Sequence, residues 1–223
     1  MRSSFFFPFE NSCIPYYTLI MENLFLHMPS RVLFGADTRL RIGTEALTYG
    51  RRALLISESV FRSTPLLEDT QTSLQKAGVE AISYTEAGPE TTSRAGEACL
   101  ELAKSGHVQI IIGLGGVRTL SLAKAVAALG STIFDIDNLT DLQHSGSSVY
   151  PYMELPTTCR SPFMLGDAFI LTDARNRHTR IIRRRGSNPQ SVIMDPRLTA
   201  ALSPRARAAT ILDTLMHSLE GFF

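Results

Sequence analysis

The segment that most constrains the fold of this chain runs from Val108 to Leu129. It begins with Val-Gln-Ile-Ile-Ile-Gly, the strongest strand pattern in the chain, and passes through Leu114-Gly115-Gly116 into a helical pattern over 119–129. A compact apolar run of this kind is typical of a strand buried on both faces. A glycine turn that leads from such a strand into a helix is typical of open parallel sheets, where ligands bind beyond the carboxyl ends of the strands. The segment therefore predicts the middle of a parallel sheet.

The same alternation of strand and helix extends over most of the chain. Because each helix between two such strands acts as a crossover, the pattern predicts a doubly wound α/β domain with helices on both faces of the sheet, up to about Pro196. A polar connection is expected over 131–151. The expected strands are 31–35, 53–57, 79–84, 108–113, 152–156, 168–172 and 191–194, and the expected helices are 38–49, 65–77, 93–104 and 119–129.

Both ends of the chain differ from this pattern. Near the C-terminus, Ser203 is placed as an N-cap, Pro204 as the first helical residue and Gly221 as the end of a last helix. At the N-terminus, a Phe-rich stretch is interrupted by Pro8 and Pro15. A signal peptide has a cleaner apolar core, so we interpret residues 1–24 as a poorly ordered extension.

Composition excludes several classes of partner. The net charge of +1 gives no reason to expect nucleic acid or a membrane surface as partner. No apolar run approaches the roughly 18 residues that a membrane span needs. The three cysteines are odd in number and lack metal-like spacing, which favours reduced thiols and a cytoplasmic location. The arginine-rich run 180–185 is interpreted as a solvated loop or strand edge.

Three features are candidates for chemistry. Asp213 and His217 lie four residues apart in the last predicted helix, so they share one face, as a divalent metal needs from a helix. By spacing alone they are equally the polar face of a packed helix. Glu58 follows a predicted strand, where a carboxylate can bind the hydroxyls of an adenosine ribose, although a surface glutamate is the simpler interpretation. The turn Gly115-Gly116 is a weak signal on its own.

The order of several short motifs makes the chain resemble the iron-containing (group III) alcohol dehydrogenases. The resemblance runs from about Phe25 to Phe223 and covers essentially the N-terminal half of that family. The matching motifs are Val32–Gly35, Gly115-Gly116 ahead of Ala123-Lys124, Pro156-Thr157-Thr158, Thr172-Asp173, Asp195-Pro196 and the Asp-x-Leu-x-His-x-x-Glu helix 213–220.

The resemblance implies a Rossmann-like domain over 25–196 that binds NAD or NADP, followed over 197–223 by the beginning of an all-helical metal-binding domain. The reaction would be hydride transfer between a small alcohol or aldehyde and nicotinamide, with Fe(II) or Zn polarising the alcohol oxygen. A Glu58 that faces the ribose would favour NAD over NADP. Assembly as a homo-oligomer is left open. By resemblance the metal ligands are Asp213 and His217, and the coenzyme contacts are Glu58, Gly115, Gly116, Thr157 and Thr158.

Several positions depart from the family pattern. The third glycine of the loop is replaced by Val117, which would push a pyrophosphate away, and the following serine by Arg118, which would supply a cation. Arg160 stands where the family has a small residue, and two further histidine ligands are not matched, so metal binding is expected to be weak. Two alternatives stay open: a non-catalytic nucleotide-binding or interaction protein derived from this fold, and an enzyme like maleylacetate reductase or a hydroxyacid transhydrogenase.

Overall fold

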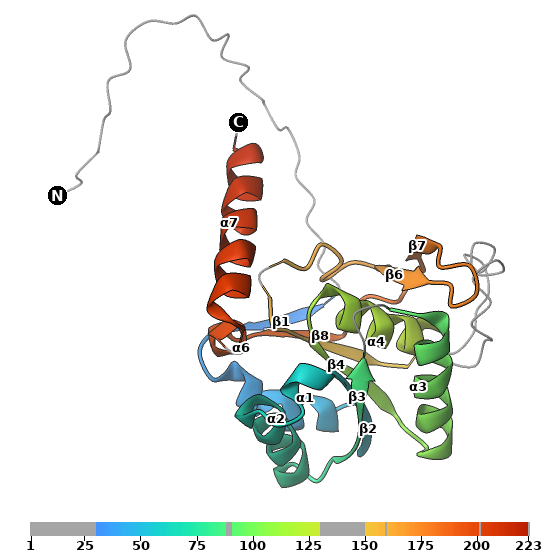
Figure 1. The fold of residues 1–223 in the computed structure, drawn as a ribbon. Coiled ribbons are helices and arrows are strands. Elements are labelled where there is room, and N and C mark those ends of the chain that lie inside the picture. Colours follow the sequence, from blue (N-terminus) through green and yellow to red (C-terminus); the bar gives the residue numbers. More distant parts are fainter. Residues whose placement is uncertain (1–29, 88–90, 130–149, 159, 201, 223) are drawn as a thin grey trace, which may run out of the picture.

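The computed structural model describes residues 30–87, 91–129, 150–158, 160–200 and 202–222. The predicted extension 1–24 and nearly all of the predicted connection 131–151 lie outside these residues. The body is a six-stranded sheet in the order β1-β8-β5-β4-β2-β3 (Figure 1), and every pair of neighbouring strands in it is parallel. The strands are β1 (Arg31–Phe34), β2 (Arg52–Glu58), β3 (Glu80–Ala87), β4 (Ile110–Gly115), β5 (Tyr152–Pro156) and β8 (Ser191–Met194).

Helices cover both faces of this sheet, which confirms the predicted doubly wound, Rossmann-like α/β fold. In β2, Leu54 and Ile56 pack in a core beneath α3 and α4, whereas Ala53 and Leu55 pack in a second core with α1 and α2. Successive side chains of a strand point to opposite faces, so two cores require the continuous apolar run that the sequence shows. The helical elements are η1 (Thr38–Arg41), α1 (Ile42–Leu47), η2 (Ser59–Phe61), α2 (Pro65–Lys76), α3 (Ser93–Ser105), α4 (Val117–Leu129), α6 (Pro196–Ala200) and α7 (Pro204–Glu220).

Two predicted features are confirmed, but they lie outside the parallel sheet. The segment 168–172 is a strand, β6 (Ala168–Thr172), but it pairs antiparallel with β7 (Thr179–Arg183) in a separate two-stranded sheet. The arginine run is therefore partly a strand, in which Ile182 is buried and Ile181 is exposed. Of the two interpretations of this run, solvated loop or strand edge, the second is confirmed, although Arg184 just after β7 is buried.

The turn after the central strand is tighter than predicted. Strand β4 continues to Gly115 and α4 already begins at Val117, so a single residue, Gly116, separates them. A Cβ added to Gly115 would lie 2.8 Å from the Cβ of Thr119 and 2.8 Å from Oε1 of Glu58. Only glycine therefore allows the strand end, the helix and Glu58 to approach this closely.

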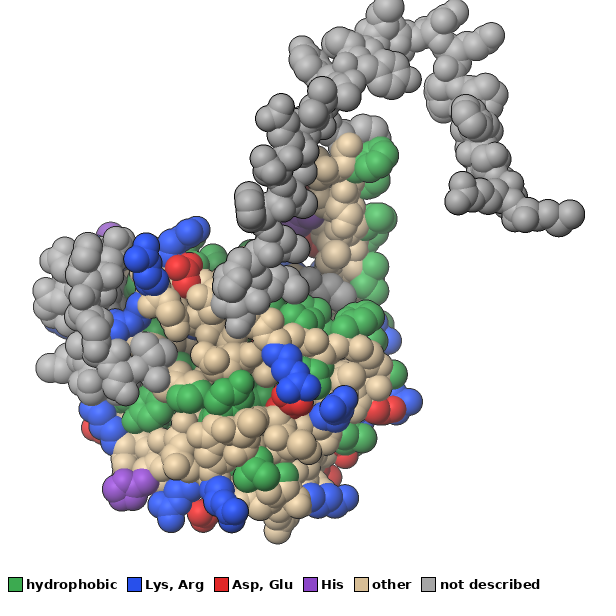
Figure 2. Space-filling view, turned by 180° about the vertical axis from the view of Figure 1, so that it is seen from behind, with side chains coloured by type: hydrophobic (Ala, Val, Ile, Leu, Met, Phe, Trp, Pro, Cys, Tyr) green, Lys and Arg blue, Asp and Glu red, His purple; other side chains and the backbone are tan. Residues whose placement is uncertain are grey.

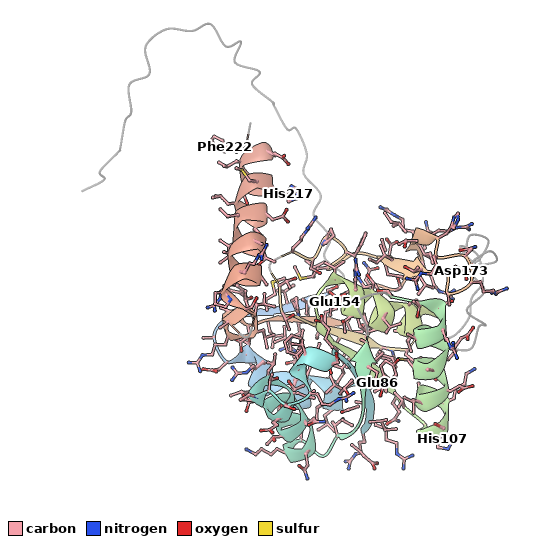
Figure 3. All side chains as sticks on the ribbon, viewed as in Figure 1. Glu86, His107, Glu154, Asp173, His217 and Phe222 are labelled. Carbon is pink, nitrogen blue, oxygen red and sulfur yellow. The ribbon has the colours of Figure 1, made fainter. Side chains whose placement is uncertain are left out.

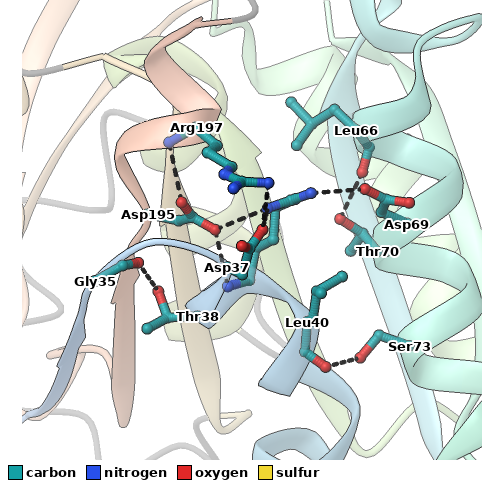
Figure 4. A network of polar contacts seen from close by, with 11 residues as sticks. Gly35, Asp37, Thr38, Leu40, Leu66, Asp69, Thr70, Ser73, Asp195 and Arg197 are labelled. Carbon is teal, nitrogen blue, oxygen red and sulfur yellow. Dashed lines mark hydrogen bonds and ion pairs between the residues drawn. The ribbon is translucent and has the colours of Figure 1, made fainter.

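An arginine just after the carboxyl end of the outer strand β1 ties three elements together (Figure 4). The side chain of Arg39 forms ion pairs with Asp37 at 2.7 Å, Asp69 of α2 at 2.9 Å and Asp195 at 3.1 Å. Burial by itself would raise the pKa of Asp195, but hydrogen bonds from the Arg197 amide and from Arg39 outweigh it and hold this pKa below its ordinary value. The network fixes η1 against α2 and the end of β8.

Helix α7 begins and ends as predicted but projects from the body (Figure 1). The Ser203 hydroxyl accepts a hydrogen bond from the Ala206 amide, Pro204 is the first helical residue and Gly221 is the C-cap. Within the described part of the chain, no residue of α7 is buried. Figure 2 shows apolar side chains along the projecting helix; the large exposed ones are Ile211, Leu212, Leu215, Met216 and Leu219. The division into domains at 196 and 197 stays a prediction.

Candidate functional site

The strand order creates a crevice at the carboxyl ends of β2 and β4. The chain runs outward from β2 to β3 and then crosses back to place β4 on the other side of β2. Connections that leave two neighbouring parallel strands in opposite directions open a ligand-binding crevice between them. Glu58 ends β2, Gly115 ends β4 and Pro156 ends β5. The five residues predicted to contact a coenzyme therefore meet at one edge of the sheet.

A pocket of about 490 Å3 opens at this crevice. Three of the predicted coenzyme residues, Glu58, Gly116 and Thr158, line it directly. The other two lie immediately behind, where the Thr157 amide donates a hydrogen bond of 3.0 Å to the Gly115 carbonyl. The remaining lining residues are Ser59, Val60, Ala87, Val117, Arg118, Thr119, Arg160 and Thr210.

The Glu58 carboxylate binds the glycine turn. Its Oε1 accepts hydrogen bonds from the Gly116 amide at 2.7 Å and from the Thr119 hydroxyl at 3.2 Å. A carboxylate near the N-terminus of a helix is favourably placed in the field of the helix dipole. The sequence suggested a ribose contact for Glu58, which stays a prediction, but gave no sign of this bond across 58 residues of chain.

Two buried hydroxyl groups flank the end of β4. Ser57 lies opposite Leu114 in the β2–β4 pairing, and Thr157 lies beside Gly115. Neither hydroxyl has a hydrogen-bond partner among the described residues. A buried polar group without a partner costs about 1–3 kcal/mol, so such groups are unusual unless a water or a ligand completes them.

A second, apolar pocket of about 470 Å3 adjoins the first, because Thr158 lines both. Its walls come from the ends of β1, β5 and β8, from the loop that contains Met164, and from α6 and α7. The side chains in it are mainly aliphatic or aromatic: Phe34, Pro156, Met164, Met194, Pro196, Ala200 and Ile211, together with Thr158, Thr199, Asp195 and Arg207.

The two predicted metal ligands share one face of α7. Asp213 Oδ2 is a buried oxygen that has an ion-pair contact but no hydrogen-bond partner among the described residues. Asp213 Oδ1 is 3.9 Å from His217 Nε2, and Asp213 Oδ2 is 3.0 Å from Arg160 Nε. His217 Nδ1 is 3.1 Å from the Glu220 carboxylate. Figure 3 places His217 on the projecting part of the helix. Among the described residues, no three His, Cys, Asp or Glu side chains lie close enough to hold one metal ion.

A buried ion pair supports the loop beside the apolar pocket. Lys124 of α4 is 1% exposed and lies 3.0 Å from Glu154 of β5 (Figure 3). It also donates hydrogen bonds to the carbonyls of Phe163 at 2.6 Å and Gly166 at 2.9 Å. Burial raises the pKa of Glu154, and Lys124 opposes this rise. Sequence reasoning noted Ala123-Lys124 only as a family motif, although a lysine in an otherwise apolar helix signals a buried charge.

Comparisons with known proteins agree with the fold and the family resemblance. Residues 29–196 match the family of iron-containing alcohol dehydrogenases. The long-chain-alcohol dehydrogenase 1 of Geobacillus thermodenitrificans is 26% identical over 175 residues, which are 77% of this chain and 44% of that protein.

Two crystal structures have the same fold. The NADH-dependent butanol dehydrogenase A of Thermotoga maritima gives a TM-score of 0.77 at 22% identity, over 89% of this chain and 50% of that one. The sulfoacetaldehyde reductase of Bifidobacterium kashiwanohense, solved in complex with NAD+, gives 0.75 at 23% identity, over 88% and 52%. This chain thus spans about half the length of the relatives that it matches. By its match over 29–196, the chain belongs to the iron-containing alcohol dehydrogenase family.

Proposed function

We propose that this chain binds NAD and takes part in hydride transfer between that coenzyme and a small alcohol or aldehyde. The observation that carries the proposal is the pocket at the strand-order crevice, which gathers Glu58, Gly116 and Thr158 from three separate strand ends. The names of the relatives support it, since they include an NADH-dependent dehydrogenase and a reductase solved with NAD+. Maleylacetate reductase and hydroxyacid transhydrogenase chemistry are alternatives within the same class.

The residues of the pocket fit a dinucleotide. Glu58, Gly116 and Thr158 line the pocket, and the unpartnered hydroxyl of Thr157 lies immediately behind it. Glu58 binds the turn through Oε1, which leaves Oε2 to accept from a ribose hydroxyl and to repel a 2′-phosphate, so NAD is preferred to NADP. When bound, NAD accepts or supplies the hydride. Thr158 stands where the polar pocket meets the apolar one, which would hold the substrate and exclude water.

The described residues do not fit the metal that the family name implies. Asp213 is already paired with Arg160, and no third ligand lies near Asp213 and His217 within the described chain. Zinc and similar metals are held by at least three protein ligands. No reaction step is therefore assigned to a metal here.

Divalent metal is expected to leave the stability of this chain unchanged. Adding Zn2+ or Fe2+, or removing metal with EDTA, should shift the thermal unfolding midpoint by less than about 1 °C, because a ligand stabilises only in proportion to its affinity. Differential scanning calorimetry checks this, with His217→Ala as the matched variant. A rise of several degrees that His217→Ala abolishes would show a metal site at α7.

The Arg160–Asp213 ion pair specifically favours a second candidate function, a non-catalytic nucleotide-binding protein derived from this fold. The pair neutralises the aspartate without a metal, at a distance of 3.0 Å. In this case NADH would bind, but no alcohol or aldehyde would be turned over with any added metal. A steady-state assay with small alcohols and aldehydes, run on a chain that binds NADH, separates the two candidates.

We also propose that the protein is located in the cytoplasm. None of the helices described in the structure is long and apolar enough to cross a membrane. Cys99 is a buried free thiol, and burial raises its pKa to about 12, so it stays protonated at neutral pH. The proposed cytoplasmic location rests on the sequence, whose three cysteines are odd in number and lack metal-like spacing.

A fluorescence titration of the chain with NADH and NADPH tests the proposed function. Saturable binding is expected for NADH and weaker binding for NADPH. The variant Thr158→Phe should weaken NADH binding by at least about tenfold, since a bulky side chain at the shared wall of the two pockets displaces the ligand. Thr48→Phe, at an exposed site on the end of α1, is the control and should bind as the unaltered chain does.

Failure of the unaltered chain to bind either nucleotide would overturn the proposed function. Binding that Thr158→Phe and Thr48→Phe leave equally unchanged would place the nucleotide elsewhere on the molecule.

A further inference from the structure

We propose that the Arg118 side chain holds the diphosphate of the bound dinucleotide, in place of the glycine-turn amide, which the Glu58 carboxylate occupies. This inference rests on the proposed function and deepens it, because it names the residue and the part of the coenzyme that meet. A simple coenzyme contact at Glu58 would strengthen binding of the whole nucleotide. In this inference the Glu58 carboxylate instead competes with the diphosphate for the Gly116 amide.

The amide that a phosphate would use is already bonded. Gly116 N–H donates to Glu58 Oε1 at 2.7 Å, a short distance that is typical of a hydrogen bond to a charged acceptor. The same oxygen also accepts from the Thr119 hydroxyl, so the carboxylate is held there by two donors. A phosphate approaching this amide would have to displace a negative charge or lie beside it. The glycine turn is therefore a poor binding site for the diphosphate, because the negative charge of Glu58 already lies there.

Two arginines line the same pocket, and they differ in what they already bind. Arg160 is 3.0 Å from Asp213 and lies on the side of α7. Arg118 is exposed, and its side chain forms no hydrogen bond or ion pair with any residue that the structure describes. An anion in this pocket can recruit Arg118 without breaking an existing pair, whereas recruiting Arg160 would leave Asp213 uncompensated.

The backbone of Arg118 is held in place, so the Cα from which its side chain extends has a defined position at the pocket. Arg118 is the second residue of α4, and its carbonyl accepts a hydrogen bond of 2.9 Å from the hydroxyl of the buried Thr91. The guanidinium group is a planar fork of donors that matches two phosphate oxygens at once. The N-terminal end of α4 adds a partial positive charge to the same wall of the pocket.

Comparing ADP with adenosine isolates the diphosphate contribution. Both ligands are titrated into the full chain by calorimetry, or by displacement of NADH fluorescence, and the ratio of their affinities is the quantity measured. In the unaltered chain ADP should bind at least about tenfold more tightly than adenosine, as expected for charged hydrogen bonds to phosphate. Arg118→Gln should reduce this ratio to near unity and leave adenosine binding unchanged.

Two further variants make the comparison specific. Arg94→Gln is the matched control, since Arg94 is the exposed second residue of the neighbouring helix α3 and does not line the pocket. It should leave the ratio unchanged. Glu58→Gln removes the competing charge and should raise the ratio of ADP to adenosine affinity, by about threefold or more, whatever it does to adenosine itself.

The inference about Arg118 and Glu58 can fail separately from the proposed function. If NADH binds but Arg118→Gln leaves the ADP-to-adenosine ratio as it was, or Glu58→Gln lowers that ratio, the inference about Arg118 and Glu58 is wrong and the proposed function stands. If the unaltered chain binds neither NADH, ADP nor adenosine, the proposed function and this inference fall together.

Discussion

Replacing Arg39 with methionine is expected to lower the free energy of unfolding by about 3–5 kcal/mol, the usual effect of removing one partner of a buried ion pair. The Asp195 side chain is fully buried, at 0% exposure, and Arg39 is its only ion-pair partner among the described residues. Methionine keeps most of the apolar stem but leaves that carboxylate without a cation. The amides of Arg39 and Arg197 still donate to Asp195 in the variant, so the carboxylate is not left without any partner.

Urea unfolding of Arg39→Met and of the control Arg52→Met checks this prediction. Arg52 forms an exposed pair with Glu80 at 3.6 Å, so its replacement should cost no more than about 1 kcal/mol. If the two variants lose similar amounts of stability, the network around Arg39 contributes little and the prediction is wrong.

The same network predicts how stability changes in acid. Asp195 has a folded-state pKa below its ordinary value of 3.8, so its contribution is fully present above that value and is lost as pH falls through the lower, folded-state pKa. Without Arg39 the folded-state pKa of Asp195 should rise towards the ordinary value. The loss of stability below about pH 4 should therefore be shallower in Arg39→Met than in the unaltered chain.

How much of this molecule the sequence predicts depends on how local each signal is. The parallel sheet follows from runs such as Ala53–Ser57, because burial on both faces is visible within one strand. Once the strands and their direction are known, their carboxyl ends share an edge, so Glu58 and Gly115 are brought together without any knowledge of side-chain contacts. Capping of α7 by Ser203 is local in the same sense and was predicted correctly.

The parts that were missed depend on contacts between distant segments. The pattern of β7 is short and rich in arginine, and its strand conformation comes from pairing with β6, which no single window of sequence reveals. The bond from Gly116 to Glu58 and the pair of Arg160 with Asp213 join residues more than 50 positions apart. Each of these contacts changes the chemistry of the site, although neither alters the fold.

Replacing Lys124 with methionine is the other change with a large expected effect, again about 3–5 kcal/mol of unfolding free energy at neutral pH. The variant leaves Glu154, which is 1% exposed, without its cation, and Oε2 of that carboxylate already lacks a hydrogen-bond partner among the described residues. Lys104→Met, on the exposed side of α3, is the control and should cost less than about 1 kcal/mol.

The pH dependence identifies the cause of this loss. Burial already raises the pKa of Glu154, and without Lys124 it should rise further, so the folded variant has to bind a proton that the unfolded chain does not. The deficit of Lys124→Met should therefore be smaller at pH 5 than at pH 7, by up to about 1.4 kcal/mol per pH unit. If the loss of unfolding free energy in Lys124→Met is independent of pH, lost packing is its cause instead.

A double variant separates the buried charge from the loop that Lys124 supports. In Lys124→Met with Glu154→Leu both charges are gone, and replacement of a whole buried pair by apolar residues is often nearly neutral. The carbonyls of Phe163 and Gly166 still lose their hydrogen-bond donor. The double variant should therefore stay less stable than the unaltered chain. The double variant is expected to be more stable than Lys124→Met by at least about 1 kcal/mol at neutral pH. If it is no more stable, Lys124 acts mainly by holding the loop at the apolar pocket, and the unpaired charge of Glu154 does not explain the loss of stability in Lys124→Met.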